Sequence, residues 1–443
     1  MAVHLSEHFT YKKLFKAVLP SIFMMIFTSI YSVVDGLFVS NFVGKTPFAA
    51  INLIMPVVMI LGSIGFMLGA GGSALVAKTL GEGDEKRANE IFSMVMYFTL
   101  IVGLIASVVV ALAIRPIAIA LGATTEMLSD CVLYGRILIS ANFIFMMQNT
   151  FQSMFIVAER PMLGFIITVA AGITNMALDA LFVVVFNWGL AGAAAATVTS
   201  YIVGGVLPLF YFLSEKNQSL IRLVKTKFDF KVLSQSCLNG SSELLSNVSA
   251  SIVSMLFNMQ LLNIAGENGV AAYGVIMYLS FVFQAVFIGY SIGVAPITSY
   301  NYGAENHAEL KNVLKKSIII SVIFGVVMTA LTEALSLPLS KIFVGYDAEL
   351  LSLTATGMKL YGLSFLIFGI NIFASSFFTS LNDGLISALI SFARTLLFQS
   401  ICILVMPNLF GTNGIWLSVV VAETLALIVS IACLITKKKK YRY

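Results

Sequence analysis

Charged residues are scarce in this chain. Asp, Glu, Lys and Arg make up only 11% of its 443 residues, whereas hydrophobic residues make up 59% and the mean hydropathy is +0.97. Soluble domains carry about 25% charged residues, so this chain cannot cover itself with a polar surface. The shortage excludes a soluble globular protein and predicts an integral membrane protein.

Cysteine and histidine are also rare, with four Cys and three His. The cysteines lie singly in apolar surroundings, and His4, His8 and His307 lie in or near polar segments. No metal-ligand spacing, disulfide framework or HExxH motif is visible in the sequence. We therefore expect no enzyme, no zinc site and no cofactor. The polar first residues and the long first apolar run also give no reason to expect a cleavable signal.

Long apolar runs dominate what remains. They are near 20 residues or longer and continuous, which predicts helices rather than the strands of about 10 alternating residues found in transmembrane barrels. Twelve segments can be marked: 14–40, 50–80, 89–114, 126–158, 161–186, 191–214, 231–264, 270–303, 311–337, 348–381, 384–406 and 413–435. The predicted fold is an all-α polytopic membrane protein with 12 transmembrane helices.

Positive charge predicts the orientation of these helices. Most Lys and Arg residues fall on the side that carries both chain ends, among them Lys78, Arg160, Arg394 and the tail Lys437–Arg442. Lys and Arg accumulate on the cytoplasmic side, so both termini are expected in the cytoplasm and the protein in the cell (inner) membrane. The basic tail is expected to meet anionic headgroups of the lipid bilayer rather than nucleic acid.

The two halves of the chain resemble each other. A shift of 222 residues, from 49 to 271, places Ala49–Met55 on Ala271–Met277 and Gly71 on Gly293. Each half holds six predicted helices, so the halves should share one orientation and be related by a pseudo-two-fold axis along the membrane normal. Two such bundles are typical of a transporter rather than a pore. The predicted parts are bundle 1–213, cytoplasmic linker 214–230, bundle 231–436 and basic cytoplasmic tail 437–443.

Two aspartates lie inside apolar runs. Asp35 lies within residues 30–39, and Asp179 lies within residues 173–185. An ionised Asp in the middle of a membrane helix costs about 3 kcal/mol, so such residues usually mark ion or proton sites. The pair is the strongest functional signal in the sequence.

Four short segments carry a resemblance to a known family: Val34–Val39, Lys78–Gly83, Asn175 with Asp179, and Pro296–Ala304. With the segment count and the repeat, they make the whole chain similar to MATE (multidrug and toxin extrusion) transporters. That family is part of the multidrug/oligosaccharidyl-lipid/polysaccharide flippase superfamily. In the branch that looks closest, the resemblance implies a cation site made of a helix 1 Asp, a helix 5 Asn and Asp, and a helix 6 Thr.

The matching residues in this sequence are Asp35, Asn175, Asp179 and Thr197. Helix geometry supports the grouping independently, because a rise of about 1.5 Å per residue puts Asp35 and Asp179 about 28 and 27 Å from the cytoplasmic ends of their helices. Thr197 lies about 9 Å from the opposite end of its helix, and Asn175 shares a face with Asp179. We expect this set to couple transport to H⁺ or to Na⁺, which prefers hard oxygen ligands.

The repeat confines this predicted site to the N-terminal half. Asp35 corresponds to Met255–Phe257, Asp179 to Ile401–Cys402 and Thr197 to Val419. None of these residues can bind a cation.

Other polar residues are candidates for substrate binding or for a second polar site. They are Glu243, Glu423, Gln148, Gln152, Gln260, Gln284 and Tyr290. Another branch of the family looks to use a helix 7 Glu with a helix 10 Asp, but residues 360–381 contain no acidic residue. The alternative is that Glu243 and Glu423 belong to a buried polar network with Asn247 or Asn258.

Together these features predict a secondary antiporter that acts as a monomer. It is expected to export amphipathic organic cations in exchange for H⁺ or Na⁺ by alternating access. The alternative is a flippase for a lipid-linked saccharide. Phosphate-bearing substrates would need a cavity rich in Arg, and we expect this chain to keep its Arg and Lys at the membrane surfaces. A channel is disfavoured because no filter-like loop is visible.

Overall fold

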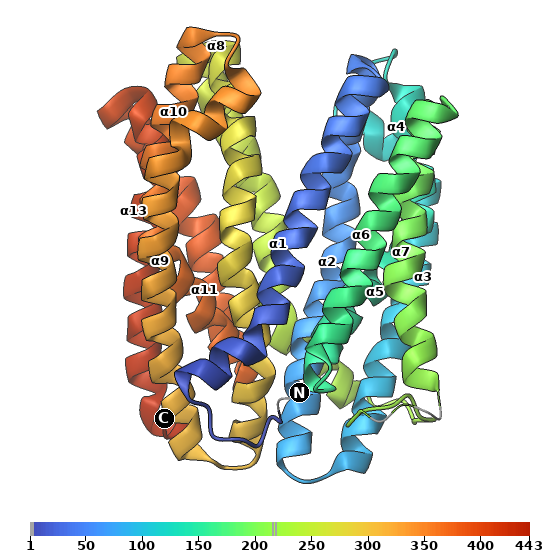
Figure 1. The fold of residues 1–443 in the computed structure, drawn as a ribbon, viewed down its shortest axis with the longest axis vertical. Coiled ribbons are helices and arrows are strands. Elements are labelled where there is room, and N and C mark those ends of the chain that lie inside the picture. The colour runs from blue at the N-terminus through green and yellow to red at the C-terminus, as the bar shows by residue number, and fades with distance from the viewer. Residues whose placement is uncertain (1–3, 215–216, 218) are drawn as a thin grey trace.

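The fold is known from a computed structural model that describes residues 4–214, 217 and 219–443. These residues form two helical bundles that stand side by side (Figure 1). The first bundle contains α1 (Tyr11–Phe42), α2 (Lys45–Gly81), α3 (Glu85–Ala120), α4 (Leu128–Ser140), α5 (Asn142–Val157), α6 (Pro161–Asp179), the π-helix η1 (Ala180–Val185) and α7 (Gly189–Leu213). The second contains α8 (Phe230–Gly303), α9 (His307–Val344), α10 (Ala348–Gly362), α11 (Phe365–Ser380), α12 (Gly384–Phe392), the π-helix η2 (Ala393–Phe398) and α13 (Gln399–Tyr441).

The helix lengths confirm the predicted 12-helix membrane protein. In the described part of the chain, eight helices are long and apolar enough to span a membrane, and the bent pairs α4–α5 and α10–α11 raise this to ten. Two of the ten, α8 and the run α12–η2–α13, are interrupted by Gly266 and Gly411, whose φ angles are 62° and 57°. This conformation is essentially restricted to glycine. The chain turns back at each glycine, so each run supplies two spans and the total is twelve.

The bends within α4–α5 and α10–α11 have a polar cause. At the 48° bend between α4 and α5, the N–H of Phe143 donates to Ser107 Oγ at 3.1 Å, and Asn142 Nδ2 donates to the Val58 carbonyl at 3.1 Å. At the 49° bend between α10 and α11, Thr329 Oγ1 donates to the Gly362 carbonyl at 3.2 Å. Side chains thus take over hydrogen bonds that a straight helix would make itself.

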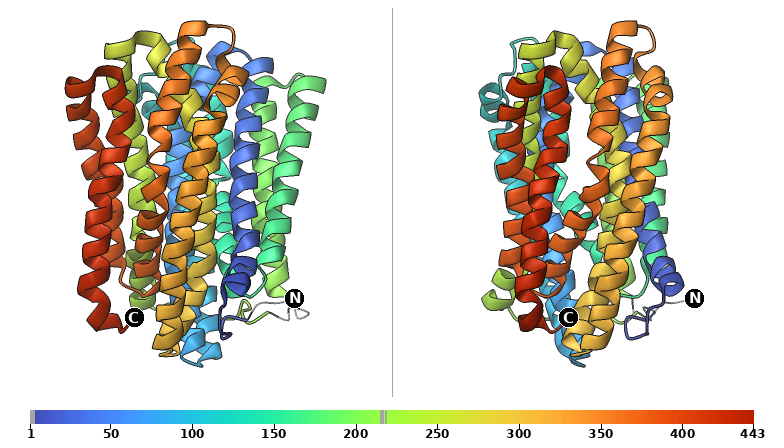
Figure 2. Two further views of the ribbon diagram at one scale, coloured as in Figure 1. Left: turned by 60° about the vertical axis from the view of Figure 1, so that its left-hand side comes forward. Right: turned by 90° about the vertical axis from the view of Figure 1, so that its left-hand side faces the viewer.

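The two bundles meet along α1, α2 and α8. The start of α1 and the end of α13 lie at the same end of the molecule, which we call the terminal end (Figures 1 and 2). In the half nearest this end, a Cβ on Gly71 of α2 would overlap the Ser236 carbonyl of α8, and a Cβ on Gly289 of α8 would come within 2.6 Å of Ile22 Cα in α1. Only glycine allows helices to approach this closely. Toward the opposite end the ribbons of the two bundles diverge (Figure 1).

The residues just before α1, 4–10, form an N-terminal strap across the terminal end. The strap reaches the turn between α5 and α6 in the first bundle and the start of α9 in the second. Each contact pairs one buried or half-buried carboxylate with a backbone N–H and a His ring, at distances between 2.6 and 2.9 Å. The groups are His4 and Leu5 with Glu159, and His8 and Phe9 with Glu309. The strap therefore ties the two bundles together.

The described residues of the predicted linker lie along α3. The N–H of Arg222 donates to Asn89 Oδ1 at 2.6 Å, and the N–H of Val224 donates to Ser93 Oγ at 2.8 Å. Asp229 ends the linker and caps α8 by accepting the N–H groups of Lys231 and Val232.

Candidate functional site

The predicted coupling residues come together where α1 packs against α6. Gly172 of α6 lies directly against Phe27 and Tyr31 of α1, so the two helix axes approach closely there. One turn further along each helix are Asp35 on α1 and Asn175 on α6. Asp179 follows Asn175 by one more turn, at the last residue of α6.

The two carboxylates form a pair. Asp35 and Asp179 interact electrostatically, and the Asn175 side chain also interacts with Asp35. Asn175 and Asp179 are only 1% and 0% exposed, and Asp35 is half-buried.

Most polar atoms of this group lack a protein partner. Within the described chain, no hydrogen bond reaches either oxygen of Asp179, Oδ1 of Asp35 or either amide atom of Asn175. Buried polar side chains are normally hydrogen-bonded, so each such exception needs an explanation. A proton or a cation shared among these oxygens would satisfy them.

A π-helix starts directly after the site. The helix changes from α6 to η1 at Ala180, immediately after Asp179. Single π-turns inside membrane helices frequently occur at functional sites, because the extra residue reorients the helix beyond it.

Thr197 lies on α7, which packs against α6. It is half-buried, and its hydroxyl donates to the Ala193 carbonyl one turn earlier at 3.0 Å. No hydrogen bond joins Thr197 to the two aspartates or to Asn175 among the residues described. Its oxygen keeps lone pairs free to accept.

Four tyrosines near Asp35 were not predicted from the sequence as part of the site. Tyr31, Tyr134, Tyr201 and Tyr278 all interact electrostatically with Asp35. Two of them had a detectable signal, because Tyr31 precedes Asp35 by four residues and Tyr201 follows Thr197 by four, which places each pair on one helix face.

Tyr278 is notable among the four because it comes from α8 of the second bundle. It is 40% exposed, whereas Tyr134 and Tyr201 are buried. Asp35 therefore interacts with a residue of the facing bundle as well as with residues of its own.

Arg394 corrects an expectation from the sequence. It was grouped with the cytoplasmic Lys and Arg, but its side chain is only 11% exposed and lies inside the second bundle. Its Nε donates to both carboxylate oxygens of Glu423, at 2.8 and 3.0 Å. The expectation that every Arg and Lys stays at a surface is thus wrong, because the buried carboxylate compensates the charge.

Glu423 is the centre of a polar network that differs from the one considered from sequence. Asn371 Nδ2 donates to Glu423 Oε2 at 2.8 Å, and Ser430 Oγ donates to Asn371 Oδ1 at 2.9 Å. Asn247 instead donates to the backbone carbonyl of Glu243 at 2.8 Å. Glu243 itself is half-buried and interacts electrostatically with Arg394.

The remaining candidates are dispersed through both bundles. Gln148 is buried against Gly204 with Oε1 unpartnered, and Gln152 donates to Thr168 Oγ1 at 3.3 Å. Tyr290 donates to Ser317 Oγ at 2.9 Å inside a hydrophobic core cluster, so it packs rather than lines a cavity. Gln284 donates to the Tyr361 hydroxyl at 3.1 Å, and Gln260 is half-buried.

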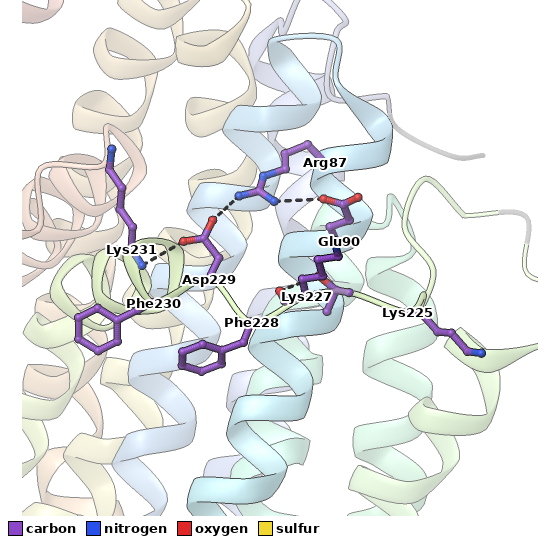
Figure 3. Close-up of a pocket in the computed structure, with 9 residues that line it drawn as sticks. Arg87, Glu90, Lys225, Lys227, Phe228, Asp229, Phe230 and Lys231 are labelled. Carbon is purple, nitrogen blue, oxygen red and sulfur yellow. Dashed lines mark hydrogen bonds and ion pairs between the residues drawn. The ribbon is translucent and has the colours of Figure 1, made fainter.

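A separate hollow of about 950 Å³ lies at the terminal end, between the linker and α3 (Figure 3). At its edge Arg87 binds Asp229 at 2.6 Å and Glu90 at 3.1 Å. The hydrogen bond from Arg87 lowers the pKa of Asp229 below its ordinary value of 3.8. None of the predicted coupling residues lines this hollow.

Comparison with known proteins gives a family match in both halves. The family model described as MatE matches residues 20–181 and 244–404. The start of the second stretch lies 224 residues after the start of the first, close to the repeat found in the sequence.

Relatives of similar length exist among characterised proteins. The chain is 25% identical over 432 residues to the multidrug export protein MepA of Staphylococcus saprophyticus subsp. saprophyticus, covering 94% of this chain and 93% of that protein. It is 26% identical over 430 residues to MepA of Staphylococcus haemolyticus, covering 94% and 92%.

Solved structures share the fold. One is an outward-facing multidrug resistance MATE family transporter of the MOP superfamily, with a TM-score of 0.93, 21% identity and coverage of 100% of this chain and 98% of that chain. Another is a MOP superfamily transporter from Pyrococcus furiosus, with a TM-score of 0.92, 22% identity and coverage of 100% and 99%. Because the family model matches more than half of the chain, the chain belongs to the MATE family, whose members are multi-pass membrane transporters rather than enzymes.

Proposed function

We propose that this protein is a multidrug efflux antiporter, which exports amphipathic organic cations from the cytoplasm in exchange for H⁺ or Na⁺. The proposal rests mainly on the pair of Asp35 and Asp179, whose oxygens are buried or half-buried and largely unpartnered. Its relatives named as multidrug export proteins support the direction and the substrate class.

The charge of the pair explains why it would take up a cation. Two ionised carboxylates close together in a low-dielectric region repel each other, and binding one positive charge relieves that repulsion. A proton would bridge the two carboxylates. Na⁺ would use the same oxygens together with the side-chain oxygens of Asn175 and Thr197, a set that suits a hard cation.

The position of α1 links this event to the shape of the molecule. Asp35 lies near one end of α1, while Val18 and Ile22 near the other end pack against Gly293 and Gly289 of α8. Pro20 lies inside α1 between Val18 and Ile22, where it removes a helix hydrogen bond and favours bending. A change of bend driven by cation binding at Asp35 would therefore reach the contact between the bundles.

The conformation fits one state of an alternating-access cycle. The glycine contacts and the N-terminal strap hold the bundles together at the terminal end, which we assign to the cytoplasm from the distribution of Lys and Arg. A cation that binds one state more tightly than the other shifts the equilibrium between them, which is the source of coupling.

Transport in inverted membrane vesicles tests the proposal. We expect uptake of a fluorescent organic cation driven by an imposed H⁺ or Na⁺ gradient, with Asp35→Asn and Asp179→Asn each reducing the gradient-driven rate at least about tenfold, about 1.4 kcal/mol of coupling. Glu126→Gln, at an exposed residue between α3 and α4, is the matched control and should transport normally. Unchanged gradient-driven transport in both Asp variants would remove the coupling role.

The flippase alternative gains one observation from the structure. Arg394 lies inside the second bundle, so the absence of buried Arg no longer argues against a phosphate-bearing substrate. Vesicles carrying a headgroup-labelled anionic lipid-linked saccharide distinguish the two functions. Translocation of that lipid without transport of organic cations would favour the flippase.

A further inference from the structure

A cavity of about 160 Å³ lies inside the second bundle, away from the aspartate pair. Its walls come from α8 on both sides of Gly266 and from α10, α11, η2 and α13. A cavity of about 150 Å³ is large enough to hold benzene, so this one can take a group the size of an aromatic ring. Its walls include Phe257, Tyr273 and Phe368.

The cavity lies at the place in the second half that corresponds, in the repeat, to the predicted coupling site of the first half. Phe257 and Val419, which both line it, are the counterparts of Asp35 and Thr197 in the first half. The second bundle thus has a cavity where the first has its carboxylates. The ionised side chain that lines this cavity is a cation, Arg394.

Arg394 presents unused hydrogen-bond donors. Glu423 engages only its Nε, and the guanidinium carbon lies 4.2 Å from the centre of the Phe368 ring. Its two terminal nitrogens make no hydrogen bond to any residue that the structure describes. A guanidinium carries four N–H groups on those nitrogens, in a planar fork that matches a carboxylate.

Tyr361 adds a further donor. Its hydroxyl accepts a hydrogen bond from Gln284 at 3.1 Å, which leaves its own hydrogen free to donate. Tyr361 and Gln284 both line the cavity beside Arg394. The cavity therefore combines aromatic walls with donors for an acceptor group.

The surrounding charges select among possible ligands. Arg394 is balanced by Glu423, and Glu243 is a second carboxylate that interacts with it. Glu243 precedes Ala250, which lines the cavity, by two helical turns on the same face of α8. A purely anionic ligand would add uncompensated negative charge here, whereas a zwitterion brings its own ammonium group for Glu243.

From this arrangement we propose that the cavity is a substrate subsite for an aromatic ring that bears a carboxylate, within a zwitterionic amphiphile. The carboxylate binds the terminal nitrogens of Arg394 and the Tyr361 hydroxyl, and the ring stacks among the aromatic walls. The physiological meaning rests on the proposed efflux function, but binding itself requires no ion gradient.

Three probes built on one ring test this subsite by saturation-transfer NMR with the full-length protein in lipid nanodiscs. They are 4-(aminomethyl)benzoate, which is a zwitterion, its methyl ester, which is a cation, and 4-methylbenzoate, which is an anion. We expect the zwitterion to bind at least about fivefold more tightly than either of the others, because the ester lacks the charged acceptor for Arg394 and the anion lacks the ammonium group for Glu243. Equal binding of all three probes would overturn the proposal.

Two variants locate the binding in this cavity. Arg394→Gln combined with Glu423→Gln removes both charges together and should abolish the preference for the zwitterion. Tyr361→Phe keeps the ring and should weaken zwitterion binding about three- to tenfold, the value of one hydrogen bond. Tyr97→Phe, at a tyrosine that is 39% exposed on α3, is the matched control. If the double variant does not fold, unchanged binding in Tyr361→Phe still contradicts the proposal.

The binding test of this subsite can be separated from the transport test of the proposed function. Asp35→Asn should lose gradient-driven transport and keep full binding of the zwitterionic probe. If transport persists in Asp35→Asn and Asp179→Asn while the probe preference holds, the coupling role fails and the subsite stands. If transport is lost but the three probes bind equally, the subsite fails and the coupling role stands.

Discussion

At the scale of single residues, this protein buries charge in two different ways. In the first bundle Asp179 is fully buried, and neither of its oxygens has a protein partner among the described residues. In the second bundle Glu423 is equally buried but is held by Arg394 and Asn371. An unpartnered buried carboxylate is costly and suits a group that gains and loses a cation. A carboxylate that is held by a guanidinium and an amide is a permanent part of the core.

The Arg394–Glu423 pair makes a clear prediction about stability. Arg394→Met leaves the Glu423 carboxylate buried without its counter-charge and should lower the free energy of unfolding by about 3–5 kcal/mol. Arg394→Met combined with Glu423→Leu should restore most of that loss, because no charge is then left unpaired. Chemical denaturation in detergent micelles measures both variants.

A surface pair is the control for this comparison. Lys78 and Glu82 form an ion pair at 3.3 Å at the end of α2, four residues apart, with side chains that are 28% and 46% exposed. Lys78→Met should change stability by less than about 1 kcal/mol. A double variant of Arg394 and Glu423 that is as unstable as the single one would show that packing, rather than charge, dominates.

At the scale of elements, the connections are tied to the helices beside them. The described part of the linker runs along α3, the strap bridges the turn before α6 and the start of α9, and side chains stabilise the bends in α4–α5 and α10–α11. Each of these attachments depends on a few polar residues. Local changes in charge should therefore release one connection without unfolding a bundle.

The linker provides a pH test at this scale. Arg87 lowers the pKa of Asp229 in the folded protein. The stabilisation from ionised Asp229 is therefore complete at pH values above its ordinary pKa of 3.8, and it is lost as the pH falls through the lower pKa of the folded state. We expect the amide protons of Lys231 and Val232, which Asp229 caps, to lose protection from hydrogen exchange only in that acidic range. Removing the partner in Arg87→Gln should move the midpoint to higher pH.

Asp229→Asn is the control for the linker experiment. It keeps the shape of the cap but cannot titrate, so protection in this variant should not depend on pH beyond the intrinsic exchange rate. An unchanged midpoint in Arg87→Gln would show that the ion pair is not the cause of the lowered pKa.

At the scale of the whole molecule, the contact between the bundles decides which end is closed. The terminal half of α2 meets α8 at Gly71 and Gly240, where either Cβ would overlap backbone of the other helix. The same two helices separate toward the opposite end (Figure 1). The balance between open states therefore depends on how well this contact packs.

Enlarging Gly71 tests this idea. In Gly71→Ala the added methyl group forces α2 and α8 apart, and overpacking of this kind costs about 1–3 kcal/mol. The distance between spin labels at Lys86→Cys and Lys311→Cys, one exposed position in each bundle near the terminal end, should shift to longer values. Double electron–electron resonance in nanodiscs reports this distribution.

Gly274→Ala is the matched control, because a Cβ there meets no atom within 4 Å. It should leave the distance distribution as it is in the wild type. If Gly71→Ala also leaves the distribution unchanged, the glycine contact does not hold the terminal end closed.

Much of the architecture could be predicted because it depends on local composition and period. Twelve apolar runs predicted twelve helices, and the fold confirms that prediction. Asp35, Asn175 and Asp179 could be grouped because depth along a helix follows directly from residue number, and the structure places the three side chains together. Their coupling role stays a prediction. Thr197 shares their region, but no hydrogen bond to them is present among the described residues.

By itself, the sequence determined that this chain is a membrane protein with twelve transmembrane helices, and that its second half repeats the first after about 220 residues. Only the tertiary structure decided where Arg394 points, which tyrosines surround Asp35, and how the strap joins the bundles. The physical reason is that apolar length and helical period act over neighbouring residues. The partner of a buried charge, such as Glu423 for Arg394, comes from another helix and becomes known only when the helices pack.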